Sequence, residues 1–243
     1  MIKGIIFDLG YTLMGFEGDR SAVERAGAEA MAAWLTSKKR IKLDPAALVE
    51  TFLAERERGA RQAVETGREV TAAESLARSL ERLEAPAAAR AHLPEALRRF
   101  FAPEEAASRV YPDAIETLKV LHGKKLRLGL LSNATDDPLV QRLVNQLYLR
   151  PWLSPTFSSA GLTWRKPCPE PFLLIAGRWG LPPSQIAVVG DMLDRDVLGA
   201  QNAGMRGIWV RREEYPRNAL NRHIRPEATV ERLADLSHVL EGW

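Results

Sequence analysis

Cysteine, clustered histidine and long apolar runs are nearly absent from this sequence, and each shortage excludes a class of protein. Cys168 is the only cysteine, and the four histidines are scattered over 243 residues. An intrachain disulfide and a zinc site with CxxC or HxxxH spacing are therefore excluded, and a reducing compartment fits best. Nowhere do about eighteen apolar residues run together, and residues 1–8 reach an acid without a long apolar region. We expect a cytoplasmic protein with no membrane partner.

Excess charge of either sign is also small: 34 Lys and Arg oppose 31 Asp and Glu, which gives a net charge of +3. The surplus lies in residues 206–225, where six arginines are offset only by Glu213 and Glu214. A nucleic-acid-binding protein typically carries a broader basic face with interleaved aromatic side chains, so we expect no nucleic-acid partner. We interpret the arginine-rich stretch as a solvated loop, and leave open that it steers anionic substrates or contacts a second subunit in a homodimer.

The remaining composition is that of a folded enzyme-sized chain, with 46% hydrophobic and 27% charged residues. Its length suits one large domain or one domain with an insertion. Short apolar runs rich in β-branched residues predict buried strands, and helix-like segments separate them. These runs are residues 2–7, 126–132, 156–159, 186–190 and 207–210. The alternation predicts an α/β fold, a Rossmann-like and mostly parallel sheet with helices on both faces. Residues 229–238 are predicted to end the chain as a helix.

Residues 15–109 differ in character, because Ala, Glu, Arg and Leu dominate and no β-branched cluster occurs. Ser21-x-x-Glu24 and Thr71-x-x-Glu74 both match the capping box that starts a helix. Asp44 before Pro45 predicts another helix start, and Gly67 predicts the end of that helix. The sequence therefore predicts an all-helical insertion directly after the first strand.

Polar side chains follow the predicted strands, at the sheet edge where ligands bind in open α/β folds. Two acids from neighbouring strands repel each other and raise each other's pKa unless a cation lies between them, and Mg²⁺ is the cation that prefers oxygen ligands. A lysine there adds positive charge for an anionic substrate, and hydroxyl and amide groups can donate hydrogen bonds to its oxygens. The candidate residues are Asp8, Ser132, Asn133, Lys166, Asp191 and Asp196.

Four motifs, in order, resemble those of the haloacid dehalogenase-like hydrolases over almost the whole chain. They are residues 7–13 (FDLGYTL), 131–133 (LSN), 165–169 (RKPCP) and 190–205 (GDMLDRDVLGAQNAGM). The resemblance implies that residues 15–109 form a helical cap and that residues 1–14 and 110–243 form the catalytic core.

The resemblance also implies a mechanism, in which Asp8 attacks phosphorus and forms an aspartyl-phosphate. Mg²⁺ would be held by Asp8, the backbone carbonyl of Gly10 and Asp191, with Asp196 orienting the metal's waters or Lys166. Lys166 would act in catalysis and, with Ser132 and Asn133, hold the phosphoryl oxygens. We therefore expect a Mg²⁺-dependent phosphohydrolase that acts on a small phosphorylated metabolite.

One position departs from the family pattern, because most of its phosphatases carry a second Asp where this chain has Gly10. That Asp acts as general acid and base, which is typically worth about 10²- to 10⁴-fold in rate. The nearest groups in sequence that can carry a proton are Tyr11, Asp19 and Asp136.

Two alternatives follow from this departure. A metal-independent 2-haloacid dehalogenase of the same family also lacks the second Asp, but it has no use for a carboxylate such as Asp191 facing the nucleophile. A non-catalytic binding module would keep the fold after losing the acid.

Overall fold

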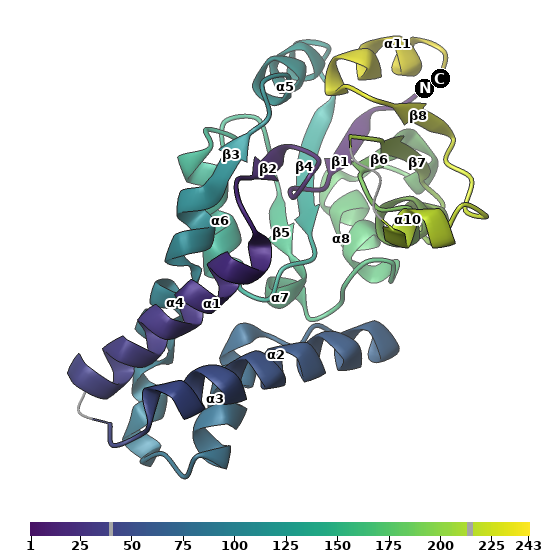
Figure 1. The fold of residues 1–243 in the computed structure, drawn as a ribbon. Coiled ribbons are helices and arrows are strands. Elements are labelled where there is room, and N and C mark those ends of the chain that lie inside the picture. Colours follow the sequence, from purple (N-terminus) through teal and green to yellow (C-terminus); the bar gives the residue numbers. More distant parts are fainter. Residues whose placement is uncertain (39–40, 213–215) are drawn as a thin grey trace.

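A parallel six-stranded sheet forms the centre of the computed structural model, which describes residues 1–38, 41–212 and 216–243 (Figure 1). The strands are β1 (Gly4–Phe7), β4 (Arg127–Ser132), β5 (Thr156–Ser158), β6 (Ile186–Gly190), β7 (Arg206–Val210) and β8 (Ala228–Val230). They lie in the order β5-β4-β1-β6-β7-β8, and every neighbouring pair is parallel. The predicted α/β fold with a mostly parallel sheet is confirmed.

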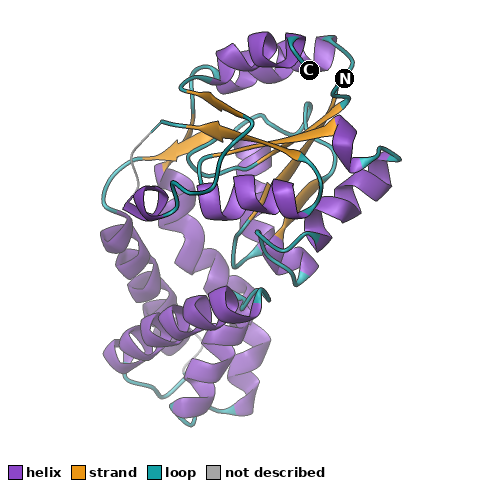
Figure 2. Ribbon diagram, turned by 90° about the vertical axis from the view of Figure 1, so that its right-hand side faces the viewer, coloured by secondary structure: helices purple, strands orange, loops and turns teal. Residues whose placement is uncertain are grey.

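Side chains of the central strand β1 alternate between two hydrophobic cores, one on each face of the sheet. Ile5 and Phe7 belong to the larger core, and Ile6 belongs to the smaller one. Strands buried in this way need helices on both faces, and Figure 2 shows helices on either side of the strands. The helices of this part are α5 (Ala114–Gly123), α6 (Asp137–Gln146), α7 (Ser159–Leu162), α8 (Glu170–Trp179), α9 (Leu198–Asn202), α10 (Pro216–Leu220) and α11 (Leu236–Glu241). Shorter helical turns are η3 (Pro183–Gln185), η4 (Leu193–Val197) and η5 (Leu233–Asp235).

Strand register brings the predicted site residues to one edge of the sheet. Phe7 at the end of β1 pairs with Leu130 of β4 and with Val189 of β6. Because all three strands are parallel, the residues that follow these positions leave the sheet at the same edge. Asp8 and Asp191, which are far apart in the sequence, therefore become neighbours.

A helical insert follows β1 and projects away from the sheet, as the purple and blue helices of Figure 1 show. It contains α1 (Arg20–Ala33), η1 (Trp34–Lys38), α2 (Pro45–Thr66), α3 (Ala72–Arg82), η2 (Ala87–His92) and α4 (Leu93–Ala107). The chain enters and leaves it through an antiparallel pair, β2 (Met14–Phe16) and β3 (Ser108–Val110). The insertion predicted from the sequence is confirmed. The predicted boundaries at residues 14/15 and 109/110 fall inside this strand pair, and the division into two domains stays a prediction.

Helix ends in the insert follow the predicted capping residues in three cases of four. Thr71 and Glu74 form a complete capping box at α3, Asp44 caps α2, and Gly67 ends α2 in the left-handed conformation that favours glycine. The prediction for Ser21 is wrong, because α1 is capped by Asp19 and the Ser21 amide and hydroxyl both donate to that carboxylate. Asp19 accepts at the start of the helix, which is the position a carboxylate favours.

The prediction for residues 229–238 is also partly wrong. The segment starts in β8, an edge strand paired with β7, and becomes helical only in η5 and α11. A three-residue strand is too short to give a period in the sequence. None of the helices in the described parts of the chain combines the length and the apolar character needed to cross a membrane.

Candidate active site

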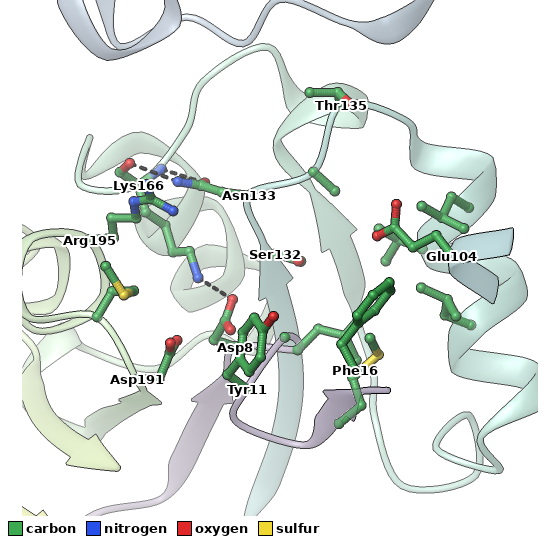
Figure 3. A pocket seen from close by; sticks show the side chains of 18 of the residues that line it. Asp8, Tyr11, Phe16, Glu104, Ser132, Asn133, Thr135, Lys166, Asp191 and Arg195 are labelled. Atoms are coloured by element: carbon green, nitrogen blue, oxygen red, sulfur yellow. Dashed lines mark hydrogen bonds and ion pairs between the residues drawn. The ribbon is translucent and has the colours of Figure 1, made fainter. Parts of the chain in front are cut away.

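Three carboxylates meet at the carboxyl edge of the sheet, and Figure 3 labels two of them, Asp8 and Asp191. Asp8 follows β1, Asp191 follows β6, and Asp196 lies in η4. Each offers an oxygen atom within 4.8 Å of the others, and their exposed fractions are only 8%, 6% and 1%. The sequence prediction that the strand ends bring these acids together is correct.

Lys166 lies among these carboxylates and is itself buried. Its Nζ donates to Asp8 Oδ1 at 2.5 Å, to Asp196 Oδ1 at 2.6 Å and to the carbonyl of Leu131 at 2.9 Å. Burial disfavours the charged lysine, but the attraction of Asp196 and Asp8 outweighs it and raises the Lys166 pKa above its usual value. The ammonium group therefore stays charged and ties two of the three acids.

The single positive charge of Lys166 does not balance the negative charge of the three acids. Burial, opposed in part by Lys166, raises the pKa of Asp8 to about 6. Burial and the repulsion of Asp8 and Asp196 raise the pKa of Asp191 to about 8. Three buried oxygen donors with this excess of negative charge suit a hard divalent cation, because Mg²⁺ binds carboxylate and carbonyl oxygens. The cluster is thus consistent with a metal site.

The motif at residues 131–133 holds the loop that carries Lys166. The Asn133 side chain donates from Nδ2 to the Lys166 carbonyl at 2.9 Å, and its Oδ1 accepts from the Lys166 amide at 2.9 Å. The side chain predicted to bind phosphate thus fixes the Lys166 backbone. Ser132 ends β4, lines the cavity and lies beside Asp8 in Figure 3. Phosphate binding by these two residues stays a prediction.

Asp196 joins the lysine to the next turn of the chain. Its Oδ1 accepts from Lys166, and its Oδ2 accepts from the amide of Met192 at 3.0 Å. The carboxylate therefore positions both Lys166 and the turn that follows Asp191, which fits the positioning role predicted for it.

A cavity of about 340 Å³ opens above the carboxylates. This volume lies at the small end of the range of about 300–1,000 Å³ that is usual for ligand pockets. Its walls include Gly10 and Tyr11 from motif one, Ser132 and Asn133 from motif two, and apolar side chains of α6. The insert contributes Arg20, Arg56, Phe101 and Glu104, and η4 contributes Arg195.

Sequence reasoning missed Glu104 and Arg195. Glu104 is one of many acids in an Ala- and Glu-rich helix, so nothing in its local sequence distinguishes it. In the cavity, burial raises the pKa of Glu104, and the nearby Arg20 and Arg56 oppose that rise. Of the three groups considered as substitutes for the missing acid, Tyr11 lines the cavity, whereas Asp19 and Asp136 cap α1 and α6.

The turn between α2 and α3 binds the loop that precedes Lys166, a contact that the sequence did not predict. The Glu69 amide donates to the Thr163 carbonyl at 2.7 Å, and the Arg165 amide donates to the Gly67 carbonyl at 3.0 Å. The buried Glu69 carboxylate accepts from Ser159 Oγ at 2.5 Å and lies 3.4 Å from the Arg165 guanidinium. Ser159 Oγ also accepts from the amide of Ala134 at 3.0 Å. We call this cluster of Glu69, Ser159 and Arg165 the Glu69 clasp.

Comparison with known proteins agrees with this geometry. Residues 2–204 match the family model described as haloacid dehalogenase-like hydrolase. The sequence is 36% identical over 95 residues to a phosphoglycolate phosphatase of Salmonella paratyphi A, a match that covers 39% of this chain and 37% of that protein. It is 33% identical over 112 residues to a glyceraldehyde 3-phosphate phosphatase of Methanopyrus kandleri, which covers 44% of this chain and 48% of that protein. Each match spans less than half the length of the curated relative.

A solved structure resembles the whole chain. The crystal structure of a 2-haloacid dehalogenase from Pseudomonas syringae pv. Tomato DC3000 superimposes with a TM-score of 0.75 and 25% sequence identity, covering 100% of both chains. The sheet and the helical insert are therefore shared with a solved fold.

Proposed function

The chain belongs to the haloacid dehalogenase-like hydrolases, and from that premise we propose that it is a Mg²⁺-dependent phosphohydrolase acting on a small phosphorylated metabolite. One observation carries the proposal: three buried carboxylates, Asp8, Asp191 and Asp196, lie together, and a single lysine pairs with only two of them. Uncompensated carboxylates at this separation are costly, and a bound divalent cation offsets that cost. A reaction that needs no metal gives no reason to keep Asp191 beside Asp8.

The metal would be held by Asp8, Asp191 and the backbone carbonyl of Gly10, and Asp196 would orient its surroundings. When bound, Mg²⁺ would offset the negative charge that develops on the transferring phosphoryl group.

Asp8 is the proposed nucleophile. Its Oδ forms a bond to phosphorus while the bond between phosphorus and the leaving-group oxygen breaks, which leaves an aspartyl-phosphate. Water then attacks phosphorus, releases orthophosphate and returns the Asp8 carboxylate. Lys166 supports both steps, because its ammonium group already lies 2.5 Å from Asp8 and adds positive charge where phosphoryl oxygens would bind. Ser132 would donate to one of those oxygens, and Asn133 would hold Lys166 in place.

We further propose that residues 15–109 act as a cap over a core formed by residues 1–14 and 110–243. Arg20, Arg56, Phe101 and Glu104 line the cavity from the insert, which supports this division. The insert would then select the substrate, while the sheet edge carries the chemistry. The names of the two curated relatives, both phosphatases of small phosphorylated metabolites, support the substrate class.

A second candidate is a metal-independent 2-haloacid dehalogenase. The full-length similarity to the Pseudomonas syringae dehalogenase favours it, as does the absence of a side-chain acid at Gly10. The Asp191 carboxylate, buried beside Asp8 with its pKa raised to about 8, argues against it.

Product release with and without metal separates these candidates. We expect orthophosphate from p-nitrophenyl phosphate with Mg²⁺, loss of that activity with a chelator, and loss in Asp8→Asn and Asp191→Asn. Asp194→Asn is the matched control, because Asp194 lies in the same turn but pairs with Arg217. Halide release from 2-chloropropionate in the presence of the chelator would favour the dehalogenase, and turnover of neither compound would favour a binding module.

A further inference from the structure

The Arg195 side chain lines the cavity and has no partner among the residues that the structure describes. It lies in η4 between Asp194 and Asp196. Among residues 1–38, 41–212 and 216–243, its guanidinium takes part in none of the hydrogen bonds or ion pairs of the structure, although the residues on either side do. In Figure 3 Arg195 lies on the side of the cavity opposite Glu104.

Two other arginines, Arg165 and Arg217, are each already paired with a carboxylate. Arg165 lies 3.4 Å from Glu69, and Arg217 lies 2.5 Å from Asp194. Burial lowers the pKa of Arg165, and the positive charges of Arg195 and Arg217 add to that effect. Two of these three guanidinium groups are thus paired with carboxylates, and the third, that of Arg195, lines the cavity.

The proposed chemistry does not account for this charge. Lys166 already supplies an ammonium group to Asp8 and Asp196, and a divalent cation would balance the two negative charges that remain on the three acids. A partly buried guanidinium without a partner is costly, whereas two parallel hydrogen bonds to a carboxylate satisfy its planar fork. The small cavity leaves room for a short leaving group that carries such a carboxylate.

We propose that Arg195 binds a carboxylate on the leaving group, so that the substrate is a small phosphomonoester that also carries a carboxylate. This inference rests on the proposed phosphohydrolase function. Arg195 is then a specificity-determining residue: it distinguishes phosphomonoesters with a carboxylate on the leaving group from those of the same size with an uncharged leaving group.

Binding of three ligands to the Mg²⁺-loaded protein tests the assignment by titration calorimetry, which requires no turnover. The ligands are phosphoglycolate, ethyl phosphate, which has a methyl group in place of the carboxylate, and orthophosphate. We expect wild-type protein to bind phosphoglycolate about 10- to 100-fold more tightly than ethyl phosphate, the range for hydrogen bonds to charged groups. In Arg195→Gln this preference should disappear while orthophosphate binding persists, and Arg195→Lys should restore part of it.

Arg217→Gln is the matched control, because it removes the same charge from the partner of Asp194, next to Arg195 in the chain, but Arg217 does not line the cavity. The preference for phosphoglycolate should survive that change. Weaker binding of all three ligands in Arg195→Gln would overturn the inference, since it would place Arg195 on the transferred phosphoryl group. Unchanged binding of all three would overturn it as well. Failure of the proposed function is a separate result, namely no hydrolysis of p-nitrophenyl phosphate by wild-type protein, whatever the binding preference.

Discussion

Gly10 leaves open space beside the nucleophile, where the family pattern places an acidic side chain. A Cβ atom built at Gly10 meets no other part of the protein within 4 Å, and the residue lines the cavity. An added side chain would therefore enter the cavity and leave the core packing intact. The backbone at position 10 has room for a side chain, so the structure does not require a glycine there.

We expect Gly10→Asp to raise kcat for ethyl phosphate by about 10²- to 10⁴-fold, the usual contribution of general acid–base catalysis. The gain should be much smaller for p-nitrophenyl phosphate, because its leaving group departs without a proton. Steady-state orthophosphate release from the two esters measures the difference. Gly10→Ala adds a Cβ atom without a carboxyl group and should give no gain. Equal gains for both esters would contradict the assigned role of this position.

Residues at the ends of predicted strands were the ones that the sequence identified correctly. Asp8 and Asp191 each follow a buried apolar run, so their positions depend only on sheet topology. Arg195, Glu104 and Glu69 were missed, because the partners of each lie far away in the sequence or are absent. A charged residue in a helix or loop has the same local pattern whether it faces solvent or a cavity.

At the scale of elements, the strands and long helices were predictable and the connections between them were not. Buried parallel strands need continuous apolar runs, and the Thr71 and Asp44 caps have side chains that satisfy backbone groups within a few residues. The strand pair β2 and β3 joins residues almost a hundred positions apart and left no local signal. The Glu69 clasp is also such a long-range contact, since it joins the α2–α3 turn to the loop before Lys166.

Loss of the Glu69 charge should disturb this loop. We expect Glu69→Gln to lower kcat for p-nitrophenyl phosphate and to destabilise the protein by about 1.5–3 kcal/mol, the worth of a hydrogen bond to a charged group. Glu55→Gln is the control, because Glu55 is an equally buried acid whose ion pairs with Arg58 and Arg82 lie within the insert. It should lower the melting temperature with little effect on kcat.

Hydrogen–deuterium exchange of residues 163–168 supplies a second readout for the same pair of variants. Exchange in this loop should rise in Glu69→Gln and stay unchanged in Glu55→Gln. Equal effects of the two variants on kcat and on exchange would show that the clasp only stabilises the fold.

At the scale of the whole molecule, several cations of the arginine-rich stretch form ion pairs with acids. In the arginine-rich stretch, Arg211 pairs with Glu231, Arg212 with Asp113 and Arg217 with Asp194. Glu213 and Glu214, which the sequence analysis counted against these arginines, lie outside the described residues. Among the described residues, the acids around Lys166 and the cation of Arg195 face the same cavity.

The acids at the site make the stability of the metal-free protein depend on pH. Folding raises the pKa of Asp8 to about 6 and that of Asp191 to about 8, from 3.8. Between the unfolded value of 3.8 and these raised pKa values, the folded state therefore binds more protons than the unfolded state. The contribution of the two acids to stability is lost as the pH rises through about 6 and about 8. Mg²⁺ binds the deprotonated carboxylates and should restore the loss at high pH.

We expect Mg²⁺ to raise the melting temperature strongly at about pH 8 and only slightly at about pH 5, where protons compete with the metal. Asp191→Asn removes one of the titrating acids and should reduce both the pH dependence and the effect of Mg²⁺. Melting curves of both proteins at the two pH values provide the measurement. An equal Mg²⁺ effect at both pH values would contradict a metal site built on these acids.

The central claim, that Asp8 carries the phosphoryl group, is tested most directly by trapping it there. Wild-type protein with Mg²⁺ and p-nitrophenyl phosphate is quenched in acid during turnover, and its peptides are analysed by mass spectrometry. Because Gly10 provides no base for the attacking water, the aspartyl-phosphate should accumulate, and the peptide containing Asp8 should gain the mass of one phosphoryl group. The same peptide of Asp8→Asn should gain nothing. Turnover of wild-type protein with no phosphoryl group on Asp8, or with the group on another residue, would contradict the account.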